Sequence, residues 1–297
     1  MTRPEVGILR EISPGIGAVL APNAGPMTHW GTNCYLVGER ELAIIDPGPA
    51  EPIHIANLLR AIGNRMVSHI LITHAHADHS AAAMALSSKT GAPIVGFGRA
   101  NAGRRSVMEQ LARAGHLAGG EGLDKTFAPD HEVNEGDTLR TSEFAARVLH
   151  IPGHFAGHLG FQIEDNIFVG DHVMDWSTSI VSPPDGHLAD FLASCKKLIS
   201  LSPSFCLTGH GGPLTDPIAR LEWLVAHRKR RESQILGTLS NAPVSIETIV
   251  SRVYPDVPSN VRPAAARNVL AHLIDLWERR IIRPLPEMRW DAKFRLR

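Results

Sequence analysis

Histidine and aspartate are concentrated in one short run of this chain, Thr73-His74-Ala75-His76-Ala77-Asp78-His79. The apolar residues Ile70-Leu71-Ile72 come directly before it, so the run begins where a buried strand is expected to end. Imidazole and carboxylate groups are the ligands that borderline divalent metals such as zinc prefer. Imidazoles this close repel one another when protonated, and a bound metal removes that conflict. The run therefore predicts a metal site at the end of a strand, with a histidine-rich solvent loop as the simpler alternative.

The composition is that of an ordinary globular protein. The chain has 297 residues, a hydrophobic share of 43%, a charged share of 20% and a formal net charge of zero. Its three cysteines, Cys34, Cys195 and Cys206, are widely spaced, which argues against a disulfide framework and fits a reducing compartment. The first residues do not resemble a signal peptide, and no apolar run is long enough to span a membrane. We therefore expect a cytoplasmic location and no membrane partner.

The charge is divided unevenly along the chain. Acidic residues are in excess before Gly211-Gly212-Pro213, and basic residues are in excess after it. Glycine and proline interrupt regular structure at this point, and long helical patterns replace short strands. We predict two domains, residues 1–213 and residues 214–297.

Strands and helices alternate in the first of these domains. Strands 31–37 and 42–45 are predicted to form a hairpin, followed by a helix at 52–62. A buried strand at 67–73 leads into the metal run, and an alanine-rich helix is predicted at 80–90. We interpret residues 99–126 as a mobile insertion near the site, with a helix at 106–114. Further strands are predicted at 93–97, 147–151, 161–163, 167–169 and 204–208.

The second domain reads as three helices and a short β-tail. The helices are predicted at 216–240, 245–253 and 261–280, and two apolar pieces split by Pro284 and Pro286 follow them. This order is typical of a winged helix-turn-helix module.

Three more segments that contain histidine or aspartate follow predicted strands at sharp turns with glycine. They are Ile151-Pro152-Gly153-His154, Gly170-Asp171-His172 and Thr208-Gly209-His210-Gly211. Together with the run at 73–79, these segments resemble the motifs of the metallo-β-lactamase superfamily over about residues 28–213. Gly31-Thr32-Asn33 and Ile45-Asp46-Pro47-Gly48 also fit. The resemblance implies an α/β (α+β) fold, an αββα sandwich with the metals at one edge.

By matching position, the resemblance implies seven ligands for two divalent metal ions. The first ion takes His74, His76 and His154; the second takes Asp78, His79 and His210; Asp171 bridges both. Zinc is the metal we expect, with manganese and iron as alternatives. A hydroxide bridging the two metals would attack a carbonyl carbon or phosphorus. Asp78 would also be catalytic, by passing a proton to the leaving group.

Two further resemblances restrict the classes of substrate that we expect. Aspartate at position 171 resembles the glyoxalase II, ribonuclease Z and lactonase branches rather than the true β-lactamases. The tail, with His227-Arg228, the segment 231–236 and a helix at 268–280, resembles the β-lactamase-like protein 2 family. We predict hydrolysis of an ester or thioester of the acyl-CoA type. The alternative is an endoribonuclease for single-stranded RNA, with the basic run 228–231 holding phosphates, although such runs are more often solvated helix faces. A homodimer is also expected.

Several neighbours of the proposed ligands receive supporting roles. His158 is expected to support a ligand by hydrogen bonding, and His172 to point away from the site. Asp46 is expected to orient a ligand histidine or the nearby backbone, with turn-capping as the alternative. For His29, Trp30, Asp175 and Trp176 the alternatives are a pocket wall and a packed loop.

Overall fold

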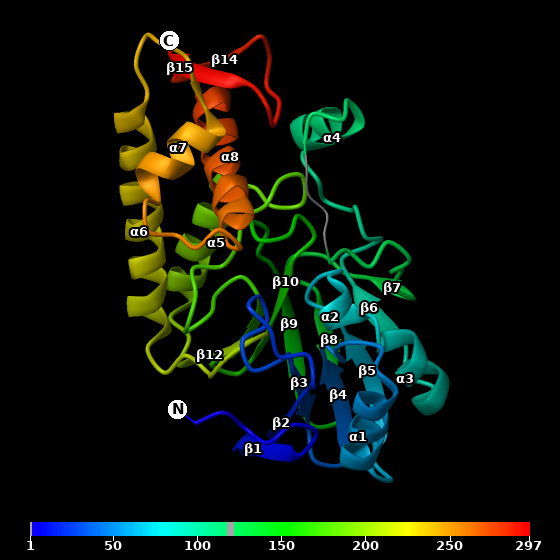
Figure 1. The fold of residues 1–297 in the computed structure, drawn as a ribbon. Coiled ribbons are helices and arrows are strands. Elements are labelled where there is room, and N and C mark those ends of the chain that lie inside the picture. Colours follow the sequence, from blue (N-terminus) through cyan, green and yellow to red (C-terminus); the bar gives the residue numbers. More distant parts are fainter. Residues whose placement is uncertain (1, 118–121) are drawn as a thin grey trace.

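Two β-sheets form the centre of the first domain in the computed structural model, which describes residues 2–117 and 122–297 (Figure 1). Neighbouring strands in the seven-stranded sheet are β1 (Leu9–Ser13), β2 (Ile16–Leu20), β3 (Asn33–Val37), β4 (Glu41–Ile45), β5 (Met66–Leu71), β6 (Ile94–Gly96) and β7 (His131–Glu132). Neighbouring strands in the five-stranded sheet are β12 (Phe205–Thr208), β11 (Asn166–Gly170), β10 (Leu159–Ile163), β9 (Ala145–His150) and β8 (Thr138–Arg140).

The two sheets bury a shared apolar core. Tyr35 and Ile45 of the first sheet belong to one cluster with Val148, Phe161 and Phe168 of the second. In β9 the inward positions are buried while Ala145 and Arg147 are exposed, as the period of two along a strand requires.

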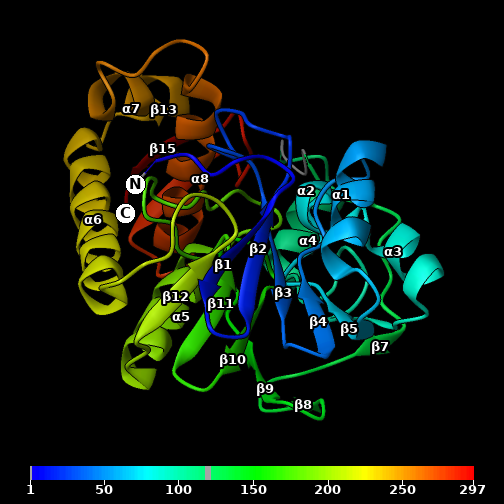
Figure 2. The ribbon, with the colours of Figure 1, turned by 90° about the horizontal axis from the view of Figure 1, so that it is seen from below.

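Helices cover the outer face of each sheet, as Figure 2 shows. Helices α1 (Pro52–Ile62) and α3 (Ala83–Thr90) pack on the seven-stranded sheet, and α5 (Leu188–Leu201) packs on the five-stranded sheet. Pro52 opens α1 with its φ already suited to a helix, and Gly63 follows the last turn at a φ of 62°. The predicted αββα sandwich is confirmed.

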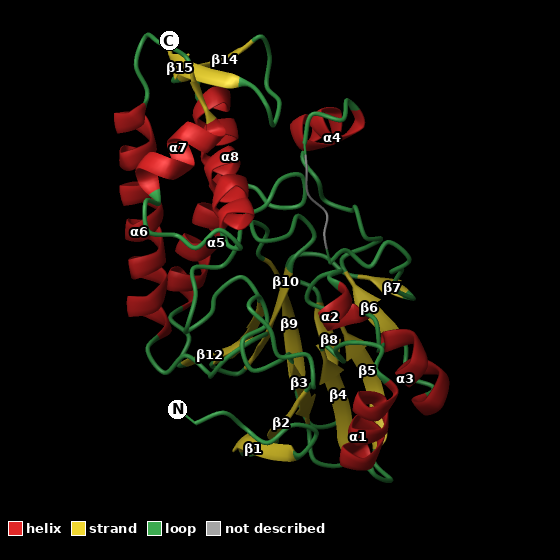
Figure 3. Cartoon of the chain, in the orientation of Figure 1, coloured by secondary structure: helices red, strands yellow, loops and turns green. Residues whose placement is uncertain are grey.

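The last part of the chain is a helical module with a small sheet (Figure 3). Its helices are α6 (Pro217–Thr238), α7 (Ile246–Val253) and α8 (Arg262–Glu278), and its strands are ordered β13 (Val244–Ser245), β15 (Lys293–Leu296) and β14 (Ile282–Leu285). Side-chain caps begin two of the helices: Asp216 accepts from Ala219 N, and Ser245 accepts from Thr248 N. This is the predicted winged helix.

Helix α4 (Ser106–Arg113), from the predicted insertion, packs on this C-terminal module. Its residues Met108 and Leu111 share one buried cluster with Phe294 and other residues of the winged helix. The main chain of Trp290 also donates to the carbonyl of His116 over 2.7 Å. The insertion predicted as mobile is therefore fastened at α4, while its residues 118–121 lie outside the described part of the chain.

Some element boundaries were predicted wrongly. The strand expected at 67–73 ends at Leu71, because Thr73 turns to bind Asp46. The helix expected at 80–90 is two pieces, α2 (Ala77–Ser80) and α3. Strands β1, β2, β7 and β8 and helix α5 were not predicted. In the described ranges, no helix combines the length and the hydropathy needed to cross a bilayer.

Candidate metal centre

The ends of four strands deliver the seven predicted ligands to one place. His74 and His76 follow β5, and the short helix α2 carries Asp78 and His79. The other three residues stand just beyond three strands of the second sheet: His154 beyond β9, Asp171 beyond β11, and His210 beyond β12. Because strands are rigid, they fix where these side chains start.

The potential ligand atoms fall into overlapping groups. In each group, one atom per residue lies within 4.8 Å of the others: His74, His76 and His154; His74, His79 and Asp171; Asp78, His79 and His210. In the first group, Nδ1 of His76 lies 2.9 Å from Nε2 of His74 and 3.1 Å from Nε2 of His154. In the third, Nε2 of His210 lies 3.3 Å from Oδ2 of Asp78.

Asp171 lies between the two ends of this cluster. Its Oδ1 is 3.4 Å from Nε2 of His79, and its Oδ2 is 3.3 Å from Nε2 of His210 and 3.9 Å from Nε2 of His154. Its carboxylate thus faces ligands of both predicted metals. This placement fits the bridging role that the resemblance implies for Asp171.

Hydrogen bonds on the outer side of four imidazoles fix where their protons lie. Nδ1 of His154 faces the carbonyl of Ile180 at 2.7 Å, and Nδ1 of His210 faces the carbonyl of Gly31 at 3.1 Å. A carbonyl only accepts, so each Nδ1 carries a proton and Nε2 is the nitrogen that is available to bind a metal ion. These Nε2 atoms point into the cluster.

Asp46 does the same for the remaining two imidazoles. Its Oδ2 accepts from Nδ1 of His79 at 2.9 Å and from the hydroxyl of Thr73 at 2.7 Å. Having donated to Asp46, the Thr73 hydroxyl can accept from Nδ1 of His74, 3.0 Å away. The expected orienting role of Asp46 is therefore what the contacts show.

The inward atoms fit a pair of cations. Nε2 of His79, Nε2 of His210 and Oδ1 of Asp171 are buried without a hydrogen-bond partner among the described residues. Buried donors and acceptors are rarely left in this state. Imidazole nitrogens and carboxylate oxygens that converge in a buried place are the donor set of a zinc-type site.

The pKa shifts of the histidines differ between the two ends of the ligand cluster. Burial and the neighbouring His154 lower the pKa of His76 to about 3. Burial also lowers the pKa of His210, but Asp171 outweighs it and raises that pKa to about 9. Burial raises the pKa of Asp78, yet His79 and His210 bring it down to about 2. The carboxylates therefore favour positive charge at the Asp78 end.

A pocket of about 480 Å³ opens onto the cluster. Five of the predicted ligands line it: His76, Asp78, His154, Asp171 and His210. Its walls are largely apolar and include Met27, Met174, Trp176 and Ile180, while Arg267 of α8 also lines it. An apolar pocket beside a polar base is the usual form of a small-molecule site.

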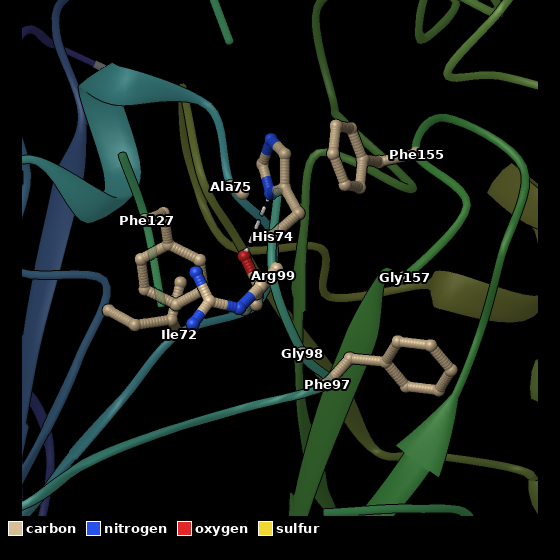
Figure 4. A pocket seen from close by; sticks show the side chains of 10 residues that line it. Ile72, His74, Ala75, Phe97, Gly98, Arg99, Phe127, Phe155 and Gly157 are labelled. Carbon is tan, nitrogen blue, oxygen red and sulfur yellow. Dashed lines mark hydrogen bonds between the residues drawn. The ribbon is translucent and has the colours of Figure 1, made fainter. Parts of the chain in front are cut away.

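Figure 4 shows the other side of His74, where its ring faces Phe155 and the dashed line marks its contact with Thr73. The two ring centroids lie 5.7 Å apart. Phe97 and Phe127 are among the residues that line a cavity of only about 10 Å³ there. His74 is thus packed from behind, which limits its movement.

The supporting histidines differ in part from expectation. His158 stacks on His74 with centroids 4.8 Å apart, but neither of its ring nitrogens has a hydrogen-bond partner in the described structure. It therefore supports its neighbour by stacking and not by the expected hydrogen bond. His172 is fully buried and faces Cys195 of α5, with its Nε2 3.7 Å from the sulfur, so it points away from the site as expected.

The structure also shows what the residues beside the pocket and the basic run 228–231 contact. His29 stacks on Trp30 and on Trp176, so this loop packs behind a residue that lines the pocket. Arg228 is 2% exposed and donates to the carbonyls of Thr178 and Ser179. The interpretation of that run as a solvated face is wrong at Arg228.

Comparisons with known proteins agree with this architecture. Residues 27–210 match the family described as the metallo-beta-lactamase superfamily, and residues 245–290 match the beta-lactamase associated winged helix domain. A beta-lactamase-like protein 2 homolog of Drosophila melanogaster is 29% identical over 270 residues, covering 87% of this chain and 86% of that protein. An atrochrysone carboxyl ACP thioesterase of Claviceps purpurea is 28% identical over 265 residues, covering 84% and 76%.

A solved structure shows the same fold over nearly the whole chain. It is a metallo-beta-lactamase family protein of Thermus thermophilus, with a TM-score of 0.77 and 24% identity, covering 97% of this chain and 100% of that one. The first family match alone spans more than half of the 297 residues. The chain therefore belongs to the metallo-beta-lactamase superfamily of hydrolases and carries the winged helix associated with it.

Proposed function

We propose that this protein is a dinuclear metal-dependent thioesterase. The observation that carries the proposal is the set of seven converging ligands, five of which line an apolar pocket of about 480 Å³. The pocket walls, with Met27, Met174 and Ile180, suit an acyl chain, and the polar base suits its carbonyl group. A relative named as a thioesterase for an acyl carrier protein, similar along most of the chain, supports this substrate class.

Two divalent ions, zinc by preference and manganese or iron as alternatives, fit the donor set. His74, His76 and His154 would hold one ion; Asp78, His79 and His210 the other; Asp171 both. Bound there, the ions would polarise the carbonyl group and make a water molecule more acidic.

The protein's own residues position the reactants. In the reaction, water adds to the carbonyl carbon, the carbon–sulfur bond breaks, and the thiolate leaves with one proton of that water. Asp78 is the carboxylate placed to relay this proton, because it lines the pocket with a side chain that is 28% exposed, whereas that of Asp171 is 9% exposed. Its low pKa keeps it ionised, so that it accepts a hydrogen bond from water.

The alternative of an RNA endonuclease receives less support. It required the basic run 228–231 to hold phosphates, yet Arg228 is buried against the first domain. Arg231 donates to the carbonyl of Val253 and lies over the ring of Tyr254, 4.0 Å from its centroid. Only Lys229 and Arg230 of the run are left exposed, which is a small footprint for a phosphate backbone.

A hydrolysis panel with a paired variant tests the proposal. We expect metal-loaded protein to cleave acyl-CoA and acyl-N-acetylcysteamine thioesters, and His76→Ala to lose both bound metal and turnover. His131→Ala, which removes an exposed histidine of β7, is the matched control and should change neither. Inert thioesters together with cleavage of single-stranded RNA would replace this proposal by the nuclease. Full turnover by His76→Ala would remove the assignment of the site.

A further inference from the structure

A second pocket adjoins the site pocket and is lined by positive side chains. It measures about 480 Å³, and its polar lining consists of Arg99, Asn101, Arg104 and Lys125. No acidic side chain is found among the described residues that line it. The whole chain has no net charge, so this concentration of one sign is local.

Two of these cations have no side-chain partner in the described part of the chain. Among residues 2–117 and 122–297, the side chains of Arg99 and Lys125 make neither a hydrogen bond nor an ion pair. Both are exposed at the pocket, and Figure 4 shows Arg99 with Phe127, which lines the same pocket. Like charges that share one pocket repel each other unless an anion is bound between them.

Arg104 connects this cationic pocket with the metal centre. Its guanidinium binds Asp185, with Nε 2.9 Å from Oδ1, and Asp185 lines the site pocket. The same two pockets meet again along the chain, since Gly122 lines one and Leu123 the other. One ligand can therefore lie with its reacting end at the metals and its anionic end at the cations.

From this geometry we infer that the cationic pocket binds the phosphate end of a phosphopantetheine thioester. The inference rests on the proposed thioesterase function and names its substrate class. A phosphopantetheine arm carries the thioester at one end, neutral amides along its length and a phosphate at the other end. Arginine and lysine are the side chains that recognise phosphate. Coenzyme A and acyl carrier proteins share this arm.

Binding of the arm without any reaction is the first measurement. Calorimetry would compare pantetheine 4′-phosphate with pantetheine, on wild type and on the double variant Arg99→Gln/Lys125→Gln. Arg104 stays unchanged because of its ion pair with Asp185. We expect the phosphate to strengthen binding to wild type on the order of tenfold or more, and the double variant to lose this gain. The control, Lys89→Gln/Arg140→Gln, removes two exposed charges elsewhere and should bind as wild type does.

Kinetics then separates this inference from the thioesterase proposal. In the double variant, KM for acyl-CoA should rise about tenfold or more while kcat stays constant, and KM for acyl-N-acetylcysteamine, which has no phosphate, should not change. Comparison of acyl-CoA with an acyl carrier protein identifies which source of the arm is preferred; a KM rise with either one supports the inference.

Different outcomes would overturn the phosphate site and the thioesterase proposal on which it rests. Equal binding of pantetheine and its phosphate by wild type, or an unchanged KM in the double variant, removes the phosphate site and leaves the thioesterase standing. Binding that depends on phosphate, without hydrolysis of any thioester, supports the site and removes the thioesterase.

Discussion

Replacement of Asp46 by asparagine would test how the site holds its histidines. Asp46 has a φ of 51°, a conformation that asparagine also tolerates, so the backbone is expected to remain in place. The two side chains have nearly the same shape. The substitution therefore changes one acceptor oxygen into a donor and removes one charge, with little else.

The loss can be estimated from the contacts of the carboxylate. Its Oδ2 accepts from His79 and Thr73, and its Oδ1 accepts from the Thr73 main-chain N–H. With its amide nitrogen at the Oδ2 position, asparagine opposes the proton on Nδ1 of His79 and favours the proton on Nε2, the atom that faces the cluster. With the nitrogen at the Oδ1 position, it opposes the main-chain N–H of Thr73, so either orientation loses one of these hydrogen bonds. A hydrogen bond to a charged group contributes about 1.5–3 kcal/mol. Loss of a partner of this kind weakens metal binding about 10- to 100-fold, or about 1.4–2.8 kcal/mol.

A competition titration against a chelator of known affinity, with bound metal counted by mass spectrometry, measures this change. We expect Asp46→Asn to bind zinc about 10- to 100-fold more weakly than wild type. Asp165→Asn removes an equal charge at an exposed turn and serves as the control. Wild-type affinity in a properly folded Asp46→Asn protein would refute the argument that this hydrogen bond sets the lone pair of His79.

Three further changes test the packing around the site. Gly153→Ala would place a Cβ 2.3 Å from the backbone of α5. Urea unfolding should therefore show a loss of stability of about 1–3 kcal/mol or more, beyond the loss in Gly136→Ala. Gly136 is the control because it also has a positive φ but has open space around it. Arg228→Met leaves carbonyls of the 178–179 loop without a donor and should lower stability by about 1–3 kcal/mol, while Arg230→Met should leave it near wild type; equal effects would refute a structural role. Burial lowers the pKa of His187, but hydrogen bonds to two carboxylates raise it overall above 6.5. Protonated His187 therefore stabilises the fold fully below pH 6.5, and this contribution is lost as the pH rises through the raised pKa. His187→Gln should flatten this part of the Tm-against-pH curve, and an unchanged slope would assign it to other groups.

The sequence predicted the metal ligands that directly follow the ends of strands. Each of His154, Asp171 and His210 follows a short apolar segment and a glycine turn, so its position at a sheet edge is a local property. The carbonyls of Ile180 and Gly31, which orient two of the imidazoles, could not be predicted. Any residue supplies a carbonyl, so no residue type marks this role.

Helix α5 and the burial of Arg228 were not predicted, but the sequence carries a signal for both. Residues of α5 repeat with helical spacing, at Leu188, Phe191, Cys195 and Leu198, and all four are buried. Arg228 stands seven residues after Leu221, on the same buried face of α6, so the period of the helix marks it as an inward position despite its basic neighbours. The cationic pocket had no such signal, because Arg99 and Lys125 come together only through the fold.

The packing of α4 has a consequence for synthesis on the ribosome. This helix emerges with the first domain, but the residues that cover Met108 and Leu111 are translated much later, in the winged helix. Until then its apolar face is exposed to solvent or to a chaperone, and an interrupted chain keeps it exposed. The nascent protein can hide this surface only after the winged helix has been translated, which makes premature termination a route to aggregation.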